Sequence, residues 1–350
     1  MRKIIHVVLA AVRPLTLTVL LAITVFGLHA QTLYIDPVNG KPGATGTQTA
    51  PLSSLEAAVE AASKFTGAQP ITLKLYPGLY TLWNRAIIRT ASADTTNDNS
   101  QYTIEAVCLP DDTSWTPAKM PVISSVSANN TTAQFPHCAG LTIAKNNVTI
   151  HGIKFLGNPN PSVNYYYPIN RENEKTSGLD ISQCYFIGEK NSAPIQGAIW
   201  AHGANIHVDH CIFYQCKNAL LLFHSITGFS VTHSVIDGSY EAAVWFGPYL
   251  GDFEFSNNIV TNCAYFWLRG ENTAPTYTFK NSIIANNEQF MGFYTHTGTS
   301  VATDNKHTET NIRKSATIRL SEVKTEGLLK DYLNPLPGSD GSDLKAGIFH

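Results

Sequence analysis

A pattern of alternating apolar and polar residues recurs along the chain from about residue 146 onward. Each occurrence reads apolar-polar-apolar, then a small polar residue, then apolar-x-apolar. Alternation is typical of a strand that turns every second side chain inward, so each occurrence predicts two short strands that meet at a tight bend. Successive occurrences start 31, 27, 23, 24 and 24 residues apart, at residues 149–155, 180–186, 207–213, 230–236, 254–260 and 278–284.

A third apolar segment follows the pair of strands in most repeats. Three strands in about 24 residues, stacked repeat upon repeat, predict an all-β fold. The expected architecture is a right-handed parallel β-helix, which is a solenoid with three parallel sheets. The third strands are expected at residues 197–202, 218–223, 242–247, 264–269 and 289–294.

The bend of each repeat forms a column of its own. Side chains stacked there can hydrogen-bond to one another and to the backbone, so we interpret its Asn and His residues as structural rather than catalytic. In the next column, Cys184 and Cys211 would lie one strand spacing apart, about 4.8 Å, and free thiols and a disulfide both stay open. The bend column contains Gly152, Gln183, His210, His233, Asn257 and Asn281.

The first thirty residues differ from the rest of the chain. A positively charged start precedes an apolar stretch over residues 15–28, and a cleavage site follows at Ala30. This is the layout of a secretory signal peptide, and an apolar core of roughly 14 residues is shorter than the ~20 of a membrane anchor. We expect residues 1–30 to be removed. Residues 31–350 would then form one domain, secreted or periplasmic, monomeric and without a membrane span.

Both ends of a solenoid need a cap, because the core of a terminal coil would otherwise be open to water. At the front, residues 53–65 predict a helix with Ser53 or Ser54 as its N-cap. At the back, residues 325–350 are rich in Gly, Pro and Asp. We expect this tail to pack over the last coil.

The front of the mature chain resembles a known family. Residues 33–62 read LYIDPVNGKPGATGTQTAPLSSLEAAVEAA, and residues 71–82 read ITLKLYPGLYTL. An extended strand, a Gly-rich loop, a capping helix and a Pro-Gly-x-Tyr turn in this order resemble exported β-helix proteins of the pectate-lyase-like superfamily. The resemblance implies the fold and places an active site on the sheet of third strands. It does not imply one reaction, because this fold hosts lyases, hydrolases, esterases, epimerases and adhesins.

Alternation along the third strands separates inward from outward residues. Exposed Trp is unusual without a ligand, and flat aromatic rings stack on sugar rings, so the outward tryptophans predict a polysaccharide platform. The alternative is that the loops at 156–178 and 187–196 cover the tryptophans as a second core. The outward positions include Trp200, Trp245 and Trp267, and, two residues further on, His202, Arg269 and Tyr294.

Candidate catalytic groups lie beside this platform. β-Elimination of a uronic-acid polymer needs a cation for the sugar carboxylate and a base for the C5 proton. Arg269 fits the first role, His202 or His224 fits the second, and Tyr240 could donate to the leaving oxygen. Hydrolysis instead needs two facing carboxyl groups, and the available ones, Glu241, Glu271 and Asp237, form no recognisable pair.

Further sugar contacts are expected from Tyr165 and Tyr167 in the loop at 160–175, and from Glu271 and Tyr294. The alternative for 160–175 is that it forms the missing third strand of its coil and a turn. With a net charge of −2 the chain offers no broad basic face for nucleic acid. No cofactor motif or metal-ligand spacing is visible, although a Ca²⁺ site built from loop oxygens stays open.

These features together predict a secreted carbohydrate-active protein that binds a polysaccharide along an outer sheet. We favour a polysaccharide lyase that acts on a uronic-acid polymer. The alternatives are a glycoside hydrolase on the same cleft and a non-catalytic glycan-binding or adhesive β-helix protein.

Overall fold

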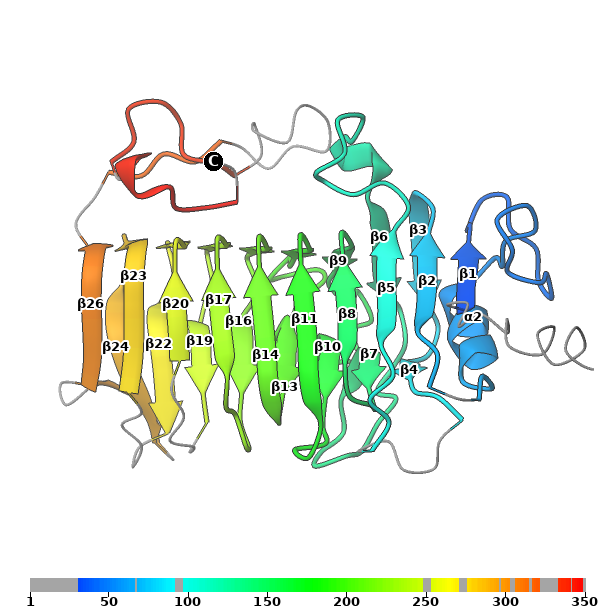
Figure 1. The fold of residues 1–350 in the computed structure, drawn as a ribbon. Helices are drawn as coiled ribbons and strands as arrows, with labels where there is room; N and C mark the ends of the chain where they lie inside the picture. Colours follow the sequence, from blue (N-terminus) through cyan, green and yellow to red (C-terminus); the bar gives the residue numbers. More distant parts are fainter. Residues whose placement is uncertain are drawn as a thin grey trace, which may run out of the picture.

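The computed structural model of the protein describes residues 31–66, 68–91, 97–247, 253–270, 276–295, 297–302, 306–314, 317–321, 333–340 and 342–348. This part of the chain forms an elongated stack of coils in chain order (Figure 1). Residues 1–30, the expected signal peptide, lie outside the described residues, so that expectation stays a prediction. No helix within the described ranges is long and apolar enough to cross a membrane.

The chain is a right-handed parallel β-helix, as the repeat predicts, and each coil contributes up to three strands that pair in parallel with their counterparts in the next coil. The first face contains β1 (Gln31–Ile35), β2 (Ile71–Leu75), β5 (Tyr102–Ala106), β8 (Val148–His151), β11 (Ser177–Ser182), β14 (Ala204–Asp209), β17 (Phe229–Thr232), β20 (Phe253–Ser256), β23 (Thr276–Ala285) and β26 (Lys306–Arg313). The second face contains β3 (Gly78–Leu82), β6 (Pro121–Ser125), β9 (Lys154–Leu156), β12 (Tyr185–Ile187), β15 (Ile212–Tyr214), β18 (Val235–Asp237), β21 (Ile259–Thr261) and the end of β23. The third face contains β4 (Ala86–Ile88), β7 (Cys138–Ile143), β10 (Tyr166–Arg171), β13 (Ile199–Ala201), β16 (Asn218–Leu222), β19 (Ala242–Phe246), β22 (Tyr265–Gly270), β24 (Gln289–Thr295) and the antiparallel β25 (Gly298–Val301).

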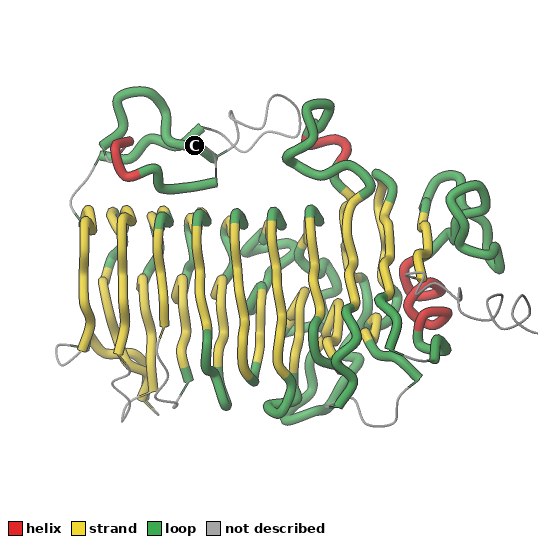
Figure 2. The backbone as a smooth tube through the Cα atoms, viewed as in Figure 1, coloured by secondary structure: helices red, strands yellow, loops and turns green. Residues whose placement is uncertain are grey.

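The first two faces form one bent 17-stranded sheet, and the third face is a separate nine-stranded sheet. β23 runs through the bend at Asn281 without a break and pairs with both β20 and β21. The three faces correspond to the three predicted parallel sheets, and the first two are joined through β23, because its bend is tight enough for one strand to continue through it. Figure 2 shows the strands stacked along the axis, with loops at the coil edges.

The residue at the bend between the first two faces has the left-handed backbone conformation in each of these coils. The six residues of the predicted bend column have φ between 45° and 71°. Gly and Asn adopt this conformation more readily than most residues, which explains their use there. The amide of Asn311 also donates to Oδ1 of Asn281 at 3.0 Å. The structural interpretation of the bend asparagines is therefore confirmed.

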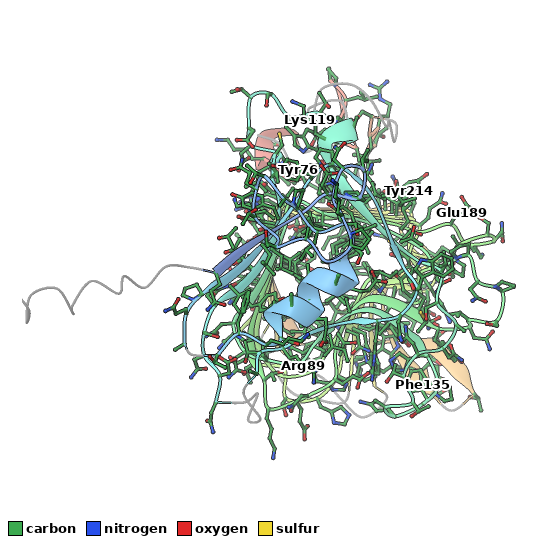
Figure 3. All side chains as sticks on the ribbon, turned by 90° about the vertical axis from the view of Figure 1, so that its right-hand side faces the viewer. Tyr76, Arg89, Lys119, Phe135, Glu189 and Tyr214 are labelled. Atoms are coloured by element: carbon green, nitrogen blue, oxygen red, sulfur yellow. The ribbon has the colours of Figure 1, made fainter. Side chains whose placement is uncertain are left out.

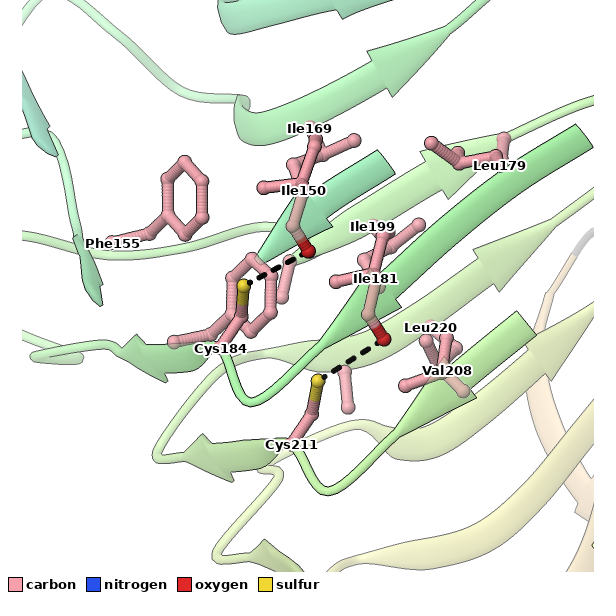
Figure 4. Close-up of a cluster of buried hydrophobic side chains, with 14 of the residues drawn as sticks. Ile150, Phe155, Ile169, Leu179, Ile181, Cys184, Ile199, Val208, Cys211 and Leu220 are labelled. Carbon is pink, nitrogen blue, oxygen red and sulfur yellow. Dashed lines mark hydrogen bonds between the residues drawn. The ribbon is translucent and has the colours of Figure 1, made fainter. Parts of the chain in front are cut away.

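Inward side chains stack from coil to coil and form a continuous core. Cys184 and Cys211 are free thiols within it, and their sulfurs lie 3.5 Å from the carbonyl oxygens of Ile150 and Ile181 (Figure 4). Of the two alternatives left open for this pair, the disulfide is therefore wrong. The same core holds a column of nearly parallel rings: Phe155, Phe186 and Phe213.

Helix α2 (Leu55–Ala62) closes the front of the solenoid, as predicted. The hydroxyl of Ser54 caps it by accepting the N–H of Ala57 at 3.2 Å. The helix is shorter than the predicted 53–65, because it starts after its cap residue and ends at Ala62. Figure 3 looks along the solenoid from this end, with α2 lying across the opening. Its buried side chains are Leu55, Ala58, Val59 and Ala62.

The C-terminal tail lies in a different place from the one predicted. Its described part, which includes the short 3-10 helix η3 (Ser342–Leu344), packs along the outer side of the second face rather than over the last coil (Figure 1). The N–H of Gly347 donates to the carbonyl of Asn257 at 2.9 Å. Another 3-10 helix, η1 (Pro117–Lys119), belongs to the loop that places Trp115 on the same outer side. The apolar contacts join Leu333, Ala346 and Ile348 to Ile212, Val235 and Ile259.

The need for a left-handed residue at the bend can be tested by substitution at Asn281. Asn281→Val should lower the free energy of unfolding by roughly 1–2 kcal/mol, because a β-branched residue is strained in the left-handed region. It also removes the amide that Asn311 contacts. Asn281→Gly removes the amide but keeps the backbone freedom, so it should cost less. Thermal unfolding followed by circular dichroism compares the two variants, and equal losses would contradict the account.

Candidate functional site

The nine-stranded sheet does not present Trp267 and Arg269 outward, contrary to the prediction. The repeat pattern in the sequence predicts that Phe266 stacks on Val244, whereas the structure pairs Val244 with Trp267. Arg269 accordingly pairs with Phe246 in an inward column. A shift of one residue moves every side chain of a strand to the other face. Trp267 is completely buried in the main core, so it offers no surface to a ligand.

Trp200 does project from the outer side of the sheet, but it is covered there. It is only 2% exposed. Its ring centroid lies 4.7 Å from that of Tyr167 and 5.6 Å from that of Phe135. Phe135 belongs to the loop before β7, which Figure 3 shows outside the coil. The covered-core alternative therefore holds for Trp200, which is covered by Tyr167 of the expected segment 156–178 and by Phe135 from an earlier loop.

Aromatic rings continue across this face in a row that becomes exposed toward both ends. Phe223 and Trp245 stack with centroids 4.8 Å apart, and both are half-buried. Tyr294 is 48% exposed at one end, and Tyr165 is 42% exposed at the other. The row spans six neighbouring strands of the sheet from β10 to β24, about 24 Å at the usual strand spacing. We call it the aromatic row: Tyr165, Phe135, Trp200, Phe223, Trp245 and Tyr294.

Two of the predicted catalytic residues meet beside this row. His202 follows β13 and His224 follows β16, and their rings lie 5.0 Å apart in an edge-to-face arrangement. Glu174 lies 3.7 Å from Nδ1 of His224 and also contacts the hydroxyl of Ser225. His224 and Glu174 are both partly exposed, so this pair is open to a ligand from solvent.

The hydrogen bonds of His202 determine which nitrogen carries its proton. The backbone N–H of His224 donates to Nδ1 of His202 at 3.1 Å, so Nδ1 carries no proton and Nε2 does. Nε2 lies 3.1 Å from the amide nitrogen of Gln134, so that amide must be turned over to place its oxygen as the acceptor. Burial, with a contribution from His224, lowers the pKa of His202 from 6.5 to about 4. His202 is therefore a neutral Nε2–H donor near neutral pH, not the base that the sequence suggested.

A second polar cluster lies on the same face near β7 and β10. His137 is fully buried and donates from Nδ1 to the carbonyl of Phe135 at 2.8 Å. Asn170 donates to Glu172 at 2.9 Å, and its amide nitrogen also lies 2.9 Å from Nε2 of His137. Burial alone would raise the pKa of Glu172, but hydrogen bonds from His137 and Asn170 more than offset it and lower that pKa. Glu172 is thus held as a carboxylate.

A cavity of about 490 Å³ opens beside this second cluster. Its lining includes Arg85, Glu172 and the loop at 129–133. Arg85 is close enough to help lower the pKa of Glu172. The charges of Glu172 and Glu174 both act to raise the pKa of His202, against the larger effect of burial. The two clusters therefore belong to one polar region beside the covered part of the aromatic row.

Tyr240 and Glu241 do not join this region. They precede β19, whereas His202 and His224 follow their strands, so the two pairs lie at opposite edges of the sheet. The edges are separated by a five-residue strand, about 16 Å. Glu241 is occupied at its own edge, where it accepts the amide of Asn218 at 2.6 Å. Tyr240 and Glu241 therefore do not share one site with His202 and His224.

Arg269 is also set apart from the polar region. It lies three strands from the coil of His202, is 2% exposed, and its guanidinium lies over the ring of Phe293 at 5.6 Å. It also donates to the carbonyl of Gly270 at 3.1 Å. Its predicted role at a sugar carboxylate does not fit this position. Glu271 lies outside the described residues, so its predicted sugar contact stays a prediction.

Several polar residues of this face were missed from the sequence. Asn170, Glu172 and Glu174 lie within five residues at the end of β10, so a short polar run marks this edge of the sheet. The run belongs to the same segment as Tyr165 and Tyr167, for which sugar contacts were predicted. His137 and Phe135 precede β7 in a coil where the repeat is too irregular to recognise. These residues supply the carboxylates and the cover that the predicted site lacked.

No protein-family model matches the chain, and no curated protein matches it. Among solved structures, a pectate lyase, Pel9A, is 12% identical, with 90% of this chain and 91% of that chain covered and a TM-score of 0.49. A rhamnogalacturonan lyase is 13% identical over 75% of this chain and 70% of that one, with a TM-score of 0.42. A pectin methylesterase from Aspergillus niger is 10% identical over 86% and 97%, with a TM-score of 0.35. These likenesses are too remote to assign a function, and the fold rests on the strand pairing described above.

The corrected register gives a prediction for Trp267. Trp267→Ala should lower the free energy of unfolding by about 3–5 kcal/mol, because it empties a large space in the core. The ring contacts Tyr277 and Phe253 with centroids 4.2 and 4.6 Å away. Trp245→Ala, at a half-buried surface position, should cost clearly less. Chemical denaturation measures both, and a reversed order would place Trp267 outside the core.

His202 gives a pH prediction. Unfolded His binds a proton near pH 6.5, whereas folded His202 does so near pH 4. The unfolded state therefore binds more protons between these values, so this contribution to stability is present above pH 6.5 and is lost as the pH falls toward 4. The His202→Gln variant should therefore lose less thermal stability than the wild type when the pH falls from 7 to 5. Nitrogen chemical shifts of His202 should report the neutral Nε2–H form at pH 5.5, and an imidazolium at that pH would contradict the assignment.

Proposed function

We propose that this protein is a carbohydrate-active β-helix protein that binds a polysaccharide along the outer face of its nine-stranded sheet. The observation that carries the proposal is the aromatic row beside a region of paired His and Glu side chains. The row is long enough for several sugar residues, and its exposed ends are aromatic. A chain of sugar rings could lie along the stacking axis, with its polar substituents toward the His and Glu side chains.

Cleavage by β-elimination of a uronic-acid polymer is the reaction that we prefer. Glu174 can hold the Nδ1 proton of His224, and Nε2 of His224 would then take the C5 proton as the base. Arg85, in the cavity beside Glu172, takes the carboxylate-binding role that the sequence assigned to Arg269. His202 offers its Nε2–H to a substrate oxygen in place of Gln134.

Glycoside hydrolysis is the second candidate, because the face holds two carboxyl groups that the sequence analysis had not paired. Glu172 and Glu174 both act electrostatically on His202. Hydrolysis needs one carboxylate and one carboxyl group that keeps its proton. The lowered pKa of Glu172 suits only the carboxylate role, which leaves the acid to Glu174. Glu174 lies 3.7 Å from Nδ1 of His224, where it supports the base of β-elimination, so hydrolysis is the less favoured reaction.

The proposed function predicts distinct effects for three variants. Polygalacturonate and alginate should yield unsaturated products, measured by their ultraviolet absorbance. His224→Ala should lower kcat by roughly 100-fold or more, since it removes the base. Trp245→Ala should raise KM with a smaller effect on kcat, because it removes a sugar contact.

Tyr240→Phe is the matched control, because Tyr240 lies at the far edge of the same sheet, and it should leave the rate unchanged. New reducing ends without unsaturated product would favour the hydrolase. Binding without any cleavage would favour the adhesive alternative. Loss of activity in Tyr240→Phe equal to that in His224→Ala would contradict the placement of the site.

A further inference from the structure

A cluster of two histidines and one aspartate lies on the opposite side of the coil from the aromatic row, at the bend between the first and second faces. His210 and His233 occupy the left-handed bend position in successive coils, and Asp209 immediately precedes the first of them. Their rings stack with centroids 4.8 Å apart and 17° between planes. The strand register of β14 and β17 fixes this spacing, since it pairs Asp209 with Thr232.

The carboxylate of Asp209 joins the two rings. Its Oδ2 lies 2.7 Å from Nδ1 of His210, and its Oδ1 lies 3.2 Å from Nδ1 of His233. One ligand atom from each of the three residues lies within 4.8 Å of the other two. Ligands around a tetrahedral Zn²⁺ with bonds near 2.0 Å are separated by roughly 3.3 Å. Small side-chain rotations would therefore bring the three donors around one ion.

The carboxylate of Asp209 is accessible as a metal ligand. It accepts hydrogen bonds from the hydroxyl of Thr232 and from both histidines. All three side chains are between 34% and 44% exposed, so an ion can enter and water can complete its coordination.

The bend itself does not require this set of residues. The same bend position is an amide in the coils on either side, namely Gln183, Asn257 and Asn281. The position before the bend is serine in two neighbouring coils, where Ser182 pairs with Asp209 and Ser256 pairs with Thr232. Asp and His therefore replace residues that already satisfy the bend, and they do so together.

We propose that Asp209, His210 and His233 bind a divalent transition-metal ion of the zinc class at this bend. Two imidazoles and one carboxylate suit Zn²⁺, Cu²⁺, Ni²⁺ or Fe²⁺ rather than Ca²⁺, which prefers oxygen ligands. The ion would take the place of the protons now shared with Asp209 and would tie two successive coils together. This site is separate from the proposed glycan face and does not depend on the proposed function.

The test is isothermal titration of the untagged, chelator-treated full chain with Zn²⁺. We expect one ion per chain, a rise in the thermal midpoint on binding, and affinity weakened by roughly tenfold or more in His210→Asn and His233→Asn, since each loses one of three ligands. Asn is the residue that the chain itself uses at this bend in Asn257 and Asn281, so both variants should unfold at the wild-type temperature without metal.

Asp209→Ser supplies a second variant matched to Ser182 and Ser256, should either His variant fail to fold. His151→Asn is the control, because His151 lies on the same face two coils away from Asp209. Unchanged affinity in His151→Asn with weakened affinity in the three bend variants supports the site. Absence of saturable Zn²⁺ binding, or equal affinity in wild type and His233→Asn, overturns it.

Discussion

The stacking of coils in this protein depends on one backbone constraint, the left-handed residue at the bend between the first and second faces. That residue lets the chain turn within one position, so the two faces meet at a sharp corner and β23 can run through the turn and join them. Because the bend recurs at the same position in each coil, the inward side chains of one coil stack on the inward side chains of the next. The phenylalanine column and the free thiols of Cys184 and Cys211 follow from this alignment.

The same alignment of coils explains where functional side chains form clusters. Side chains at equivalent positions of neighbouring coils are brought within about 5 Å, so a row of like residues becomes a surface of like character. On the nine-stranded sheet this produces the aromatic row, and at the ends of β10, β13 and β16 it collects the His and Glu residues. At the bend it brings together two histidines from successive coils. One repeat therefore builds both a long apolar face and compact polar clusters.

The sequence predicted the fold well because the repeat encodes it directly. The strands, the bend column and the capping helix all follow from local alternation and spacing. The site was predicted less well, for two physical reasons. A single-residue change in spacing before β22 moved Trp267 and Arg269 into the core, and no local signal reports such a change. The loop that carries Phe135 and His137 covers Trp200 through contacts distant in sequence, which alternation within one strand cannot reveal.

Binding of a uronide oligomer across Trp245 is the central claim, and tryptophan quenching tests it most directly. Trp115, Trp200 and Trp267 are buried, whereas Trp83 is 77% exposed and Trp245 is half-buried. In a Trp83→Phe background, a soluble quencher should therefore reach Trp245 and essentially no other tryptophan. The account predicts that saturating oligouronide protects this fluorescence from iodide. Unchanged quenching at oligouronide concentrations that saturate binding would contradict it.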